Sequence, residues 1–147
     1  MEHEVFMKRA LDLAKMAGDM GEIPVGALVV KDGKIIGEGH NLREQNRIAT
    51  AHAEVIAIEE ACKRLGGWRL SGCTLYVTLE PCPMCAGAIV NSRIEKLVYA
   101  LDDPRAGCYG SVLNFNSYPF NHSCDVESGV CAEESAELLK EFFKKKR

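Results

Sequence analysis

Two short stretches of the chain carry side chains that could bind a metal ion and activate water. One is His-Ala-Glu, with His52 and Glu54, and the other is Pro-Cys-Pro-Met-Cys, with Cys82 and Cys85. Zinc favours four tetrahedral positions filled by imidazole nitrogen and thiolate sulfur, and a catalytic zinc ion has three protein ligands and one open position. We therefore expect the histidine and both cysteines to bind one zinc ion, with Glu54 beside it as a general acid/base.

The cysteine pair by itself is a weak signal. A lone C-x-x-C is also typical of a redox pair or of half of a structural zinc site. A structural site needs a fourth thiolate or imidazole, and the remaining cysteines and histidines offer no second close pair. A redox pair would leave the His-x-Glu unexplained, so the two stretches together favour catalytic zinc.

Composition limits the classes of protein that fit. With 147 residues, 47% of them hydrophobic, the chain suits a single domain over residues 1–147. Seven cysteines are an odd number, and neither a secretory leader nor a long apolar span is evident, so we expect a cytoplasmic protein with reduced thiols and no membrane partner. A net charge of −3 argues against bulk electrostatic binding of nucleic acid. The basic run at residues 144–147 fits a solvated helix end or a local contact with nucleic acid.

Local patterns predict a helix followed by a hairpin. Apolar residues recur at steps of three and four before position 20, at Phe6, Ala10, Leu13 and Ala17. This spacing predicts an opening helix that Gly18 and Gly21 end. Strands are predicted over residues 25–30 and 34–38, because the Asp32-Gly33 between them favours a two-residue turn in which both positions need positive φ.

The metal-binding stretches are predicted to lie at the starts of two helices. A helix over residues 51–65 follows from the repeat of Ala51, Val55, Ile58, Cys62 and Leu65. His52 and Glu54 then fall in its first turn. Residues 74–79 alternate as a strand does, and Pro83 suits the first turn of the next helix. The positive end of that helix should favour thiolate over thiol at Cys82 and Cys85.

The order of elements indicates an α/β protein. Residues 96–100 read as a further strand, and strand, helix, strand in succession implies a right-handed parallel crossover. We therefore expect a mixed sheet with a hairpin at one side, parallel strands beyond it and helices on its faces. Residues 101–122 are predicted to be a long loop with at most one short element, and residues 132–146 an amphipathic helix.

The two stretches resemble the halves of the zinc deaminase signature, H-x-E and P-C-x-x-C. The sequences of residues 50–54 and 78–87 are similar to those of bacterial tRNA-specific adenosine deaminases. Further segments resemble that family in the same order along the chain, at residues 23–27, 91–94, 121–122 and 138–143. The resemblance implies a three-layer α/β/α cytidine-deaminase-like fold with a mixed five-stranded sheet. It also implies one zinc ion per subunit, no organic cofactor, and a homodimer in which the apolar helix around residues 86–90 is a plausible contact.

The family acts on adenosine at the wobble position of a tRNA anticodon and produces inosine, so the resemblance implies the anticodon stem-loop as partner. Carried across, Asn41 would contact the base, Asp103 and Arg105 would approach neighbouring nucleotides, and Phe142 with the basic tail would support the loop. Each also has a purely structural interpretation. Asn41 could cap a turn, Asp103-Pro104 could be turn chemistry, and Phe142 could belong to the core.

Two other functions remain open at this point. The signature alone gives only the reaction class, and Pro83 is reminiscent of free-base deaminases, so a deaminase of free guanine or cytosine is the main alternative. An RNA-binding module with a structural metal and no turnover is another. Release of ammonia from an anticodon stem-loop, but not from free bases or adenosine, would separate the three.

Overall fold

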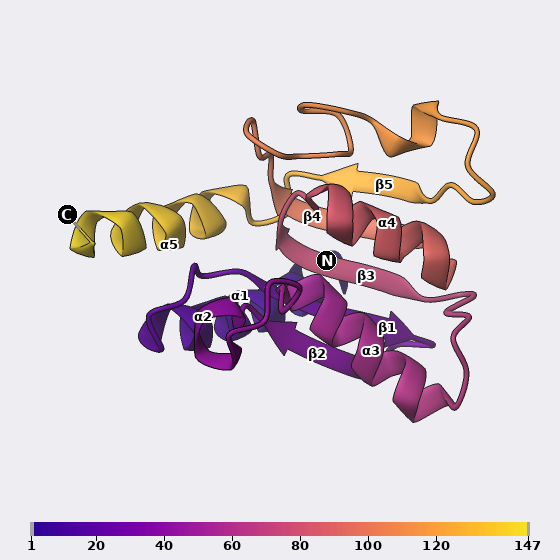
Figure 1. Ribbon diagram of the computed structural model, residues 1–147, viewed down its shortest axis with the longest axis horizontal. Coiled ribbons are helices and arrows are strands. Elements are labelled where there is room, and N and C mark those ends of the chain that lie inside the picture. Colours follow the sequence, from indigo (N-terminus) through magenta and orange to yellow (C-terminus); the bar gives the residue numbers. More distant parts are fainter. Residues whose placement is uncertain (1, 147) are drawn as a thin grey trace.

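The computed structural model describes residues 2–146 of the chain. Five strands form one sheet, and helices cover both of its faces (Figure 1). In spatial order the strands are β2 (Lys34–His40), β1 (Gly26–Lys31), β3 (Thr74–Leu79), β4 (Lys96–Leu101) and β5 (Asp125–Ser128). One face carries α3 (Ala53–Leu65) and α4 (Pro83–Ser92), and the other carries α1 (Glu2–Asp19) and α5 (Ala132–Lys145). Among the described residues, no helix combines the length and apolar character needed to cross a membrane.

The sheet is mixed, as the sequence predicts. Strand β1 pairs antiparallel with β2 and with β3, whereas the pairs β3–β4 and β4–β5 are parallel. The hairpin turn has φ of 51° at Asp32 and 76° at Gly33, which are the positive values that a tight two-residue turn requires. The expected three-layer α/β/α architecture with a mixed five-stranded sheet is therefore confirmed.

The central strands are buried on both faces, and alternate side chains divide between two cores. Residues facing α1 form one core with that helix: Met7, Ala10, Leu13, Leu28, Val30, Tyr76, Val98 and Ala100. Residues of the opposite face pack against α3 and α4, and include Ala27, Val29, Ala57, Ala61, Leu75, Val77, Ile89 and Leu97. This double burial holds the ends of β1 and β3, and the segments that follow them, in fixed positions.

Helix α3 is confirmed, but it begins at Ala53, so that His52 precedes the first turn in which it was predicted to lie, and its buried stripe differs from the predicted one. Its fully buried apolar residues include Ala53, Ala57 and Ala61, whereas Leu65 is exposed and Cys62 is half-buried. The reason lies in β2, where a Cβ at Gly39 would overlap the carbonyl oxygen of Ala53. The helix backbone thus lies directly on the strand backbone, and only small side chains fit between them. This close approach sets the position of His52, which immediately precedes Ala53.

Other differences from the sequence expectations are small. Strand β2 continues two residues beyond the predicted end, and α5 ends one residue earlier than predicted. The short helix α2 (Arg43–Asn46) is not predicted, because four residues carry too little periodicity to show. The edge strand β5 is the fifth strand that the resemblance implies, although no pattern in its four residues gives its position. The loop 101–122 contains one short element, the 3-10 turn η1 (Phe115–Ser117). Of the basic run at residues 144–147, the last residue lies outside the described part.

Candidate active site

The candidate ligands lie at the starts of the two helices on the same face of the sheet. His52 is the residue before α3, and Cys82 is the residue before α4, whose first residue is Pro83. Neither residue uses its side chain to cap its helix. Cys85 lies in the first turn of α4 and is fully buried. The positive ends of both helices therefore point toward the cluster and favour anionic sulfur there.

The three side chains have the spacing of ligands around one ion. The Nδ1 atom of His52 lies 3.7 Å from the Sγ of Cys82 and 3.6 Å from the Sγ of Cys85. A tetrahedral zinc ion with ordinary bond lengths would separate nitrogen and sulfur ligands by about 3.6 Å. Within residues 2–146 these three form the only group of at least three acidic, histidine or cysteine ligand atoms lying within 4.8 Å of one another. The cluster could therefore hold a metal ion and leave one tetrahedral position free of protein ligands.

The electrostatics of the cluster favour a cation. Hydrogen bonding with Cys85 lowers the pKa of Cys82 to about 4, so this sulfur is a thiolate at neutral pH. The same interaction raises the pKa of Cys85, which keeps its proton as long as no cation is present. Hydrogen bonding with Cys82 raises the pKa of His52. An ion in the middle would replace the protons that these three groups now share.

Glu54 combines deep burial with a position beside the cluster. It lies in the first turn of α3 and its side chain is 4% exposed. Burial raises its pKa to about 7. A carboxyl group with such a pKa can both accept and release a proton near neutral pH, as a general acid/base must.

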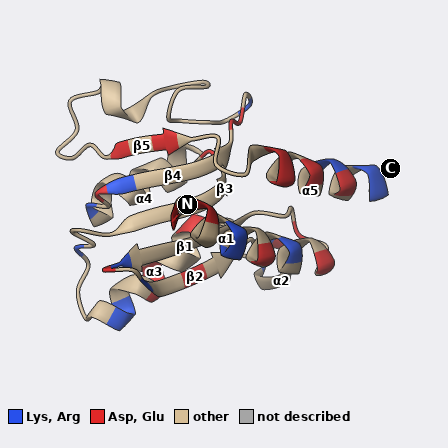
Figure 2. Cartoon of the chain, turned by 180° about the vertical axis from the view of Figure 1, so that it is seen from behind, with Lys and Arg blue, Asp and Glu red and all other residues tan. Residues whose placement is uncertain are grey.

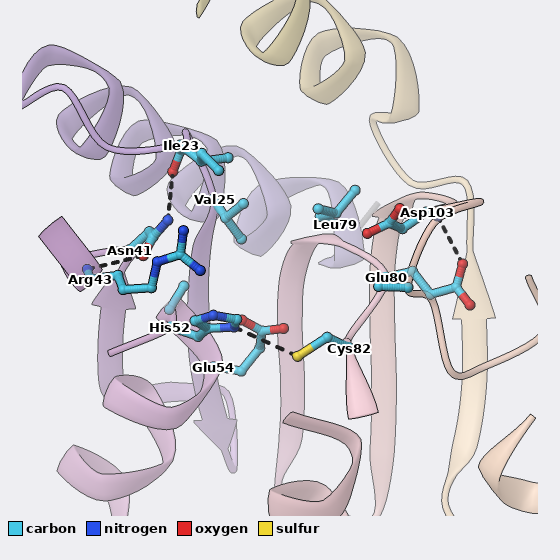
Figure 3. Close-up of a pocket in the computed structure, with 12 residues that line it drawn as sticks. Ile23, Val25, Asn41, Arg43, His52, Glu54, Leu79, Glu80, Cys82 and Asp103 are labelled. Carbon is cyan, nitrogen blue, oxygen red and sulfur yellow. Dashed lines mark hydrogen bonds between the residues drawn. The ribbon is translucent and has the colours of Figure 1, made fainter. Parts of the chain in front are cut away.

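A cavity of about 190 Å³ opens onto the cluster and onto Glu54 (Figure 3). One wall comes from the segment after β2, and the opposite wall comes from β3 and the loop after β4. Its lining residues are Ile23, Val25, Asn41, Arg43, His52, Ala53, Glu54, Leu79, Glu80, Cys82, Asp103 and Ala106. Elements distant in the sequence thus enclose the candidate metal site.

The four residues predicted to contact RNA do not all lie in the same cavity. Asn41 and Asp103 line the cavity itself. Arg105 lines an adjoining cavity that shares Asp103 and also includes Phe143 and Lys146. Phe142 is absent from both linings; it faces α1 and a third cavity, which it shares with Asn41. Phe143, which is 46% exposed, is the aromatic residue that lines the adjoining cavity together with Arg105.

Asn41 and Asp103 also make the turn contacts that their structural interpretations suggest. The Asn41 side chain accepts a hydrogen bond from the backbone N–H of Arg43 at 3.2 Å and donates one to the carbonyl of Ile23 at 3.4 Å. The Asp103 carboxylate accepts a hydrogen bond from the backbone N–H of Arg105 at 3.0 Å. These bonds hold both side chains at the cavity wall.

Comparisons with known proteins agree with this geometry. A family model described as MafB19-like deaminase matches residues 1–147. The tRNA-specific adenosine deaminase of Bacillus subtilis (strain 168) is 52% identical over 147 residues, which cover 99% of this chain and 91% of that protein. A solved structure from a study of A-to-I editing by tRNA:A34 deaminases at the wobble position of transfer RNA matches with a TM-score of 0.89 and 47% identity, over 91% of this chain and 98% of the other. The chain belongs to the tRNA-specific adenosine deaminases.

A guanine deaminase also shares this fold, but its similarity to the chain is lower. The structure of guanine deaminase from Bacillus subtilis matches with a TM-score of 0.67 and 38% identity, over 82% of this chain and 88% of that one. Both values are lower than those for the tRNA:A34 deaminase structure. The free-base alternative is therefore less well supported.

Three residues that form or support the cavity were not predicted from the sequence. Arg43 lines the cavity, and it could have been suspected from its place two residues after Asn41. The buried carboxylate of Glu22 accepts hydrogen bonds from the backbone N–H groups of Glu44 and Gln45, at 3.1 and 2.6 Å, and so holds the first turn of α2. Glu80, also buried, binds the loop after β4 in a similar way. No local pattern marks these acceptors, because their donors are more than 20 residues away.

Proposed function

We propose that this protein performs hydrolytic deamination of adenosine to inosine at the wobble position of a tRNA anticodon, with a zinc ion held by His52, Cys82 and Cys85. The observation that carries the proposal is the convergence of these three ligand atoms with a buried, proton-accepting Glu54 at the end of one cavity. The adenosine deaminase relatives support the choice of substrate.

Glu54 has the central part in the chemistry. When bound, zinc lowers the pKa of a water molecule and so supplies a nucleophile at neutral pH. Glu54 accepts the proton that the water loses and delivers it to N1 of the adenine ring as oxygen adds to C6. Glu54 then takes the proton of the new hydroxyl group on C6 and delivers it to the exocyclic amine, which leaves as ammonia and converts adenosine to inosine. The pKa of about 7 at Glu54 suits both transfers.

The two adjoining cavities receive different parts of the RNA, one the target base and the other its neighbouring nucleotides. A cavity of about 190 Å³ is smaller than the roughly 300–1,000 Å³ of drug-sized ligand sites, and suits one planar base. Asn41 contacts that base. The adjoining cavity, with Asp103, Arg105, Phe143 and Lys146, receives neighbouring nucleotides through charge and stacking. Phe142 supports this region from the α1 side and carries Lys146 5.5 Å above its ring.

The anticodon loop is a suitable substrate on energetic grounds. Its bases are not locked in a duplex, so turning one outward costs only a few kcal/mol. Local cations suffice for a short loop, and Figure 2 shows basic residues gathered at the last turn of α5, beyond acidic residues in its earlier turns. A free base would occupy only the smaller cavity and would contact neither the adjoining cavity nor the lysines.

A homodimer and a cytoplasmic location complete the proposal. Helix α4 buries Ala86 and Ile89 in the core, while Ala88 and Val90 are only half-buried. A second copy would cover these small apolar residues. Sedimentation of the purified protein at micromolar concentration should give the mass of a dimer, and a monomer mass would remove this part of the proposal.

Sequencing of RNA tests reaction and substrate together. Total tRNA treated with the zinc-loaded protein should show an adenosine-to-inosine change at one anticodon position. Ammonia should be released from an anticodon stem-loop but not from guanine, cytosine or adenosine. Turnover of a free base without any change in tRNA would instead support the free-base alternative, and absence of turnover with intact RNA binding would support a binding module.

A further inference from the structure

Glu80 is a buried carboxylate whose hydrogen-bond donors all belong to one loop. Its side chain is 2% exposed, and no salt bridge to it occurs within residues 2–146. Oε1 accepts from the backbone N–H of Asp103 at 2.9 Å, and Oε2 accepts from those of Tyr109 and Ser111 at 2.9 and 3.1 Å. The Ser111 hydroxyl donates a fourth bond, to Oε1. Dipoles of the loop thus take the place of a counter-cation.

The carboxylate does not point at the candidate metal cluster. Figure 3 shows it turned away from His52 and Cys82, toward the backbone at Asp103. Two backbone bonds join the same segments: Glu80 N–H donates to the carbonyl of Leu101, and Cys108 N–H donates to that of Pro81, both at 2.9 Å. The strand end that leads to a candidate ligand and the loop that walls the cavity are therefore joined at several points.

Gly107 lets the loop close around this carboxylate. A Cβ at position 107 would overlap the carboxyl atoms of Glu80, although the backbone there is not in the left-handed region. The glycine is therefore required for space and not for conformation. Its own N–H donates to the carbonyl of Asp103 at 2.9 Å, which closes the turn that contains Asp103 and Arg105.

We propose that Glu80 is a positioning residue for RNA recognition, which holds the loop of Asp103 and Arg105 in the conformation that receives the nucleotides beside the target base. This inference rests on the proposed function, because that function gives the loop its contact with RNA. Glu80 lines the cavity, but its carboxylate is bound by the loop and contacts neither the substrate nor the metal in this role. Its effect is on how tightly the RNA binds, and not on the chemical step.

Replacing Glu80 by glutamine breaks this support at one defined point. The amide oxygen can keep the bonds from Tyr109 and Ser111 if the NH₂ group takes the position of Oε1. The Ser111 hydroxyl can then rotate and accept from the NH₂ group, since a hydroxyl serves as donor or acceptor. The N–H of Asp103 has no such choice and loses its acceptor.

Kinetics with an anticodon stem-loop carrying adenosine at the wobble position test this step. For Glu80→Gln we expect KM to rise about tenfold, which corresponds to one lost hydrogen bond to a charged group. The kcat at saturating RNA and the zinc content should stay within about twofold of the parent protein. Glu38→Gln is the matched control, because the carboxylate of Glu38, on β2, pairs with Arg9 of α1 and lies outside the cavity linings.

A second pair of variants approaches the same contact from the loop and stands even if Glu80→Gln fails to fold. Gly107→Ala should raise KM by displacing the carboxylate, and Gly67→Ala, where a Cβ meets nothing within 4 Å, should not. Adding Glu80→Asp to Gly107→Ala withdraws the carboxylate by one methylene and should restore at least half of the lost affinity on a logarithmic scale. Such rescue would show that the contact between residue 107 and the carboxylate sets the affinity for RNA, and the unchanged kcat separates this effect from general loss of structure.

The outcomes separate this inference from the function on which it rests. Failure of the parent protein to deaminate the stem-loop would overturn the proposed function. Deamination by the parent protein with unchanged KM in Glu80→Gln and Gly107→Ala would overturn only the positioning role. Loss of kcat and zinc at constant KM would overturn it too, because Glu80 would then act on the metal ligands.

Discussion

The Nδ1 atom of His52 lies 3.7 Å from the Sγ of Cys82, although 30 residues separate them in the chain. The two residues precede α3 and α4, which start side by side on the same face of the sheet. Their approach depends on the depth at which each helix sits, and for α3 that depth is set by glycines in β2. The fold, and not local sequence, brings the cluster together.

Removal of one thiolate should abolish metal binding. We expect Cys82→Ser to contain less than a tenth of the zinc of the parent protein and to lose deamination, because a hydroxyl is a poor substitute for thiolate on zinc. The parent protein should also unfold at lower temperature after chelation, since an ion that binds only the folded state stabilises it by about 2.7 kcal/mol at 100 times its Kd. Metal analysis and thermal unfolding with and without chelator provide the measurements.

The half-buried Cys62 supplies the control for that experiment. Its thiol lies near the end of α3 and donates to the carbonyl of Trp68 at 3.7 Å, away from the cluster. Cys62→Ser should keep zinc and keep the response to chelator. Equal zinc contents in both variants would show that Cys82 is not a ligand.

Loss of the general acid/base should stop turnover without loss of metal. Glu54→Gln keeps the shape of the buried side chain but cannot carry the proton, so we expect kcat to fall by about 10²- to 10⁴-fold. Zinc content should match the parent protein. Glu59→Gln, on an exposed turn of the same helix, should keep full activity. Deamination by Glu54→Gln at near the parent rate would refute its role.

The basic end of α5 should contribute to RNA binding through charge. Replacing Lys144, Lys145 and Lys146 with glutamine should weaken binding of the stem-loop at low salt. It should also reduce the slope of log K against log salt by about 2, at roughly 0.7 per phosphate contact on single strands. Replacing Lys63 and Arg64, at the far end of α3, should leave the slope unchanged. An unchanged slope in the triple variant would remove the tail from the RNA site.

The pair of Arg9 and Glu38 should give a small, pH-dependent stability. Arg9 donates two hydrogen bonds to the carboxylate, at 2.6 and 3.0 Å, and this hydrogen bonding lowers the pKa of Glu38 below its usual value. Because the side chain of Arg9 is 42% exposed, screening limits the contribution to about 1 kcal/mol.

The direction of the pH effect follows from the lowered pKa. Stability from the pair is complete above the unfolded pKa of about 4.3 and disappears as the pH falls through the lower folded value. The free energies of unfolding of the parent protein and of Glu38→Gln in urea should therefore differ at pH 7, and this difference should shrink as the pH falls below the unfolded pKa of about 4.3. A difference that stays constant as the pH falls would mean that packing, and not charge, causes it.

Periodicity and motif were sufficient for the main features of fold and site. The Asp32-Gly33 turn, the order of helices and strands, and the place of Cys82 before Pro83 each depend on residues close together in the chain. The convergence of His52 with the cysteines could be expected only because two separate motifs each supplied part of one ligand set. The roles of these residues remain predictions until the variants above are measured.

Features that depend on contacts between distant segments could not be predicted. The alanine face of α3 is buried because β2 has glycines opposite it, which no count along α3 alone reveals. No local pattern marks Glu22 or Glu80, yet each binds backbone N–H groups more than 20 residues away. Which of Phe142 and Phe143 lines the cavity that contains Arg105 likewise depends on how α5 is rotated against α1 and against the loop after β4.

Glu22 and Glu80 anchor the opposite walls of the cavity from beneath, one through the start of α2 and the other through the loop of Asp103. Both walls are thus stiff before any ligand arrives. We therefore expect the cavity walls to move little when an anticodon binds, so that most of the conformational change on association occurs in the nucleic acid. Loops that already hold the wobble nucleotide outward should dock fastest.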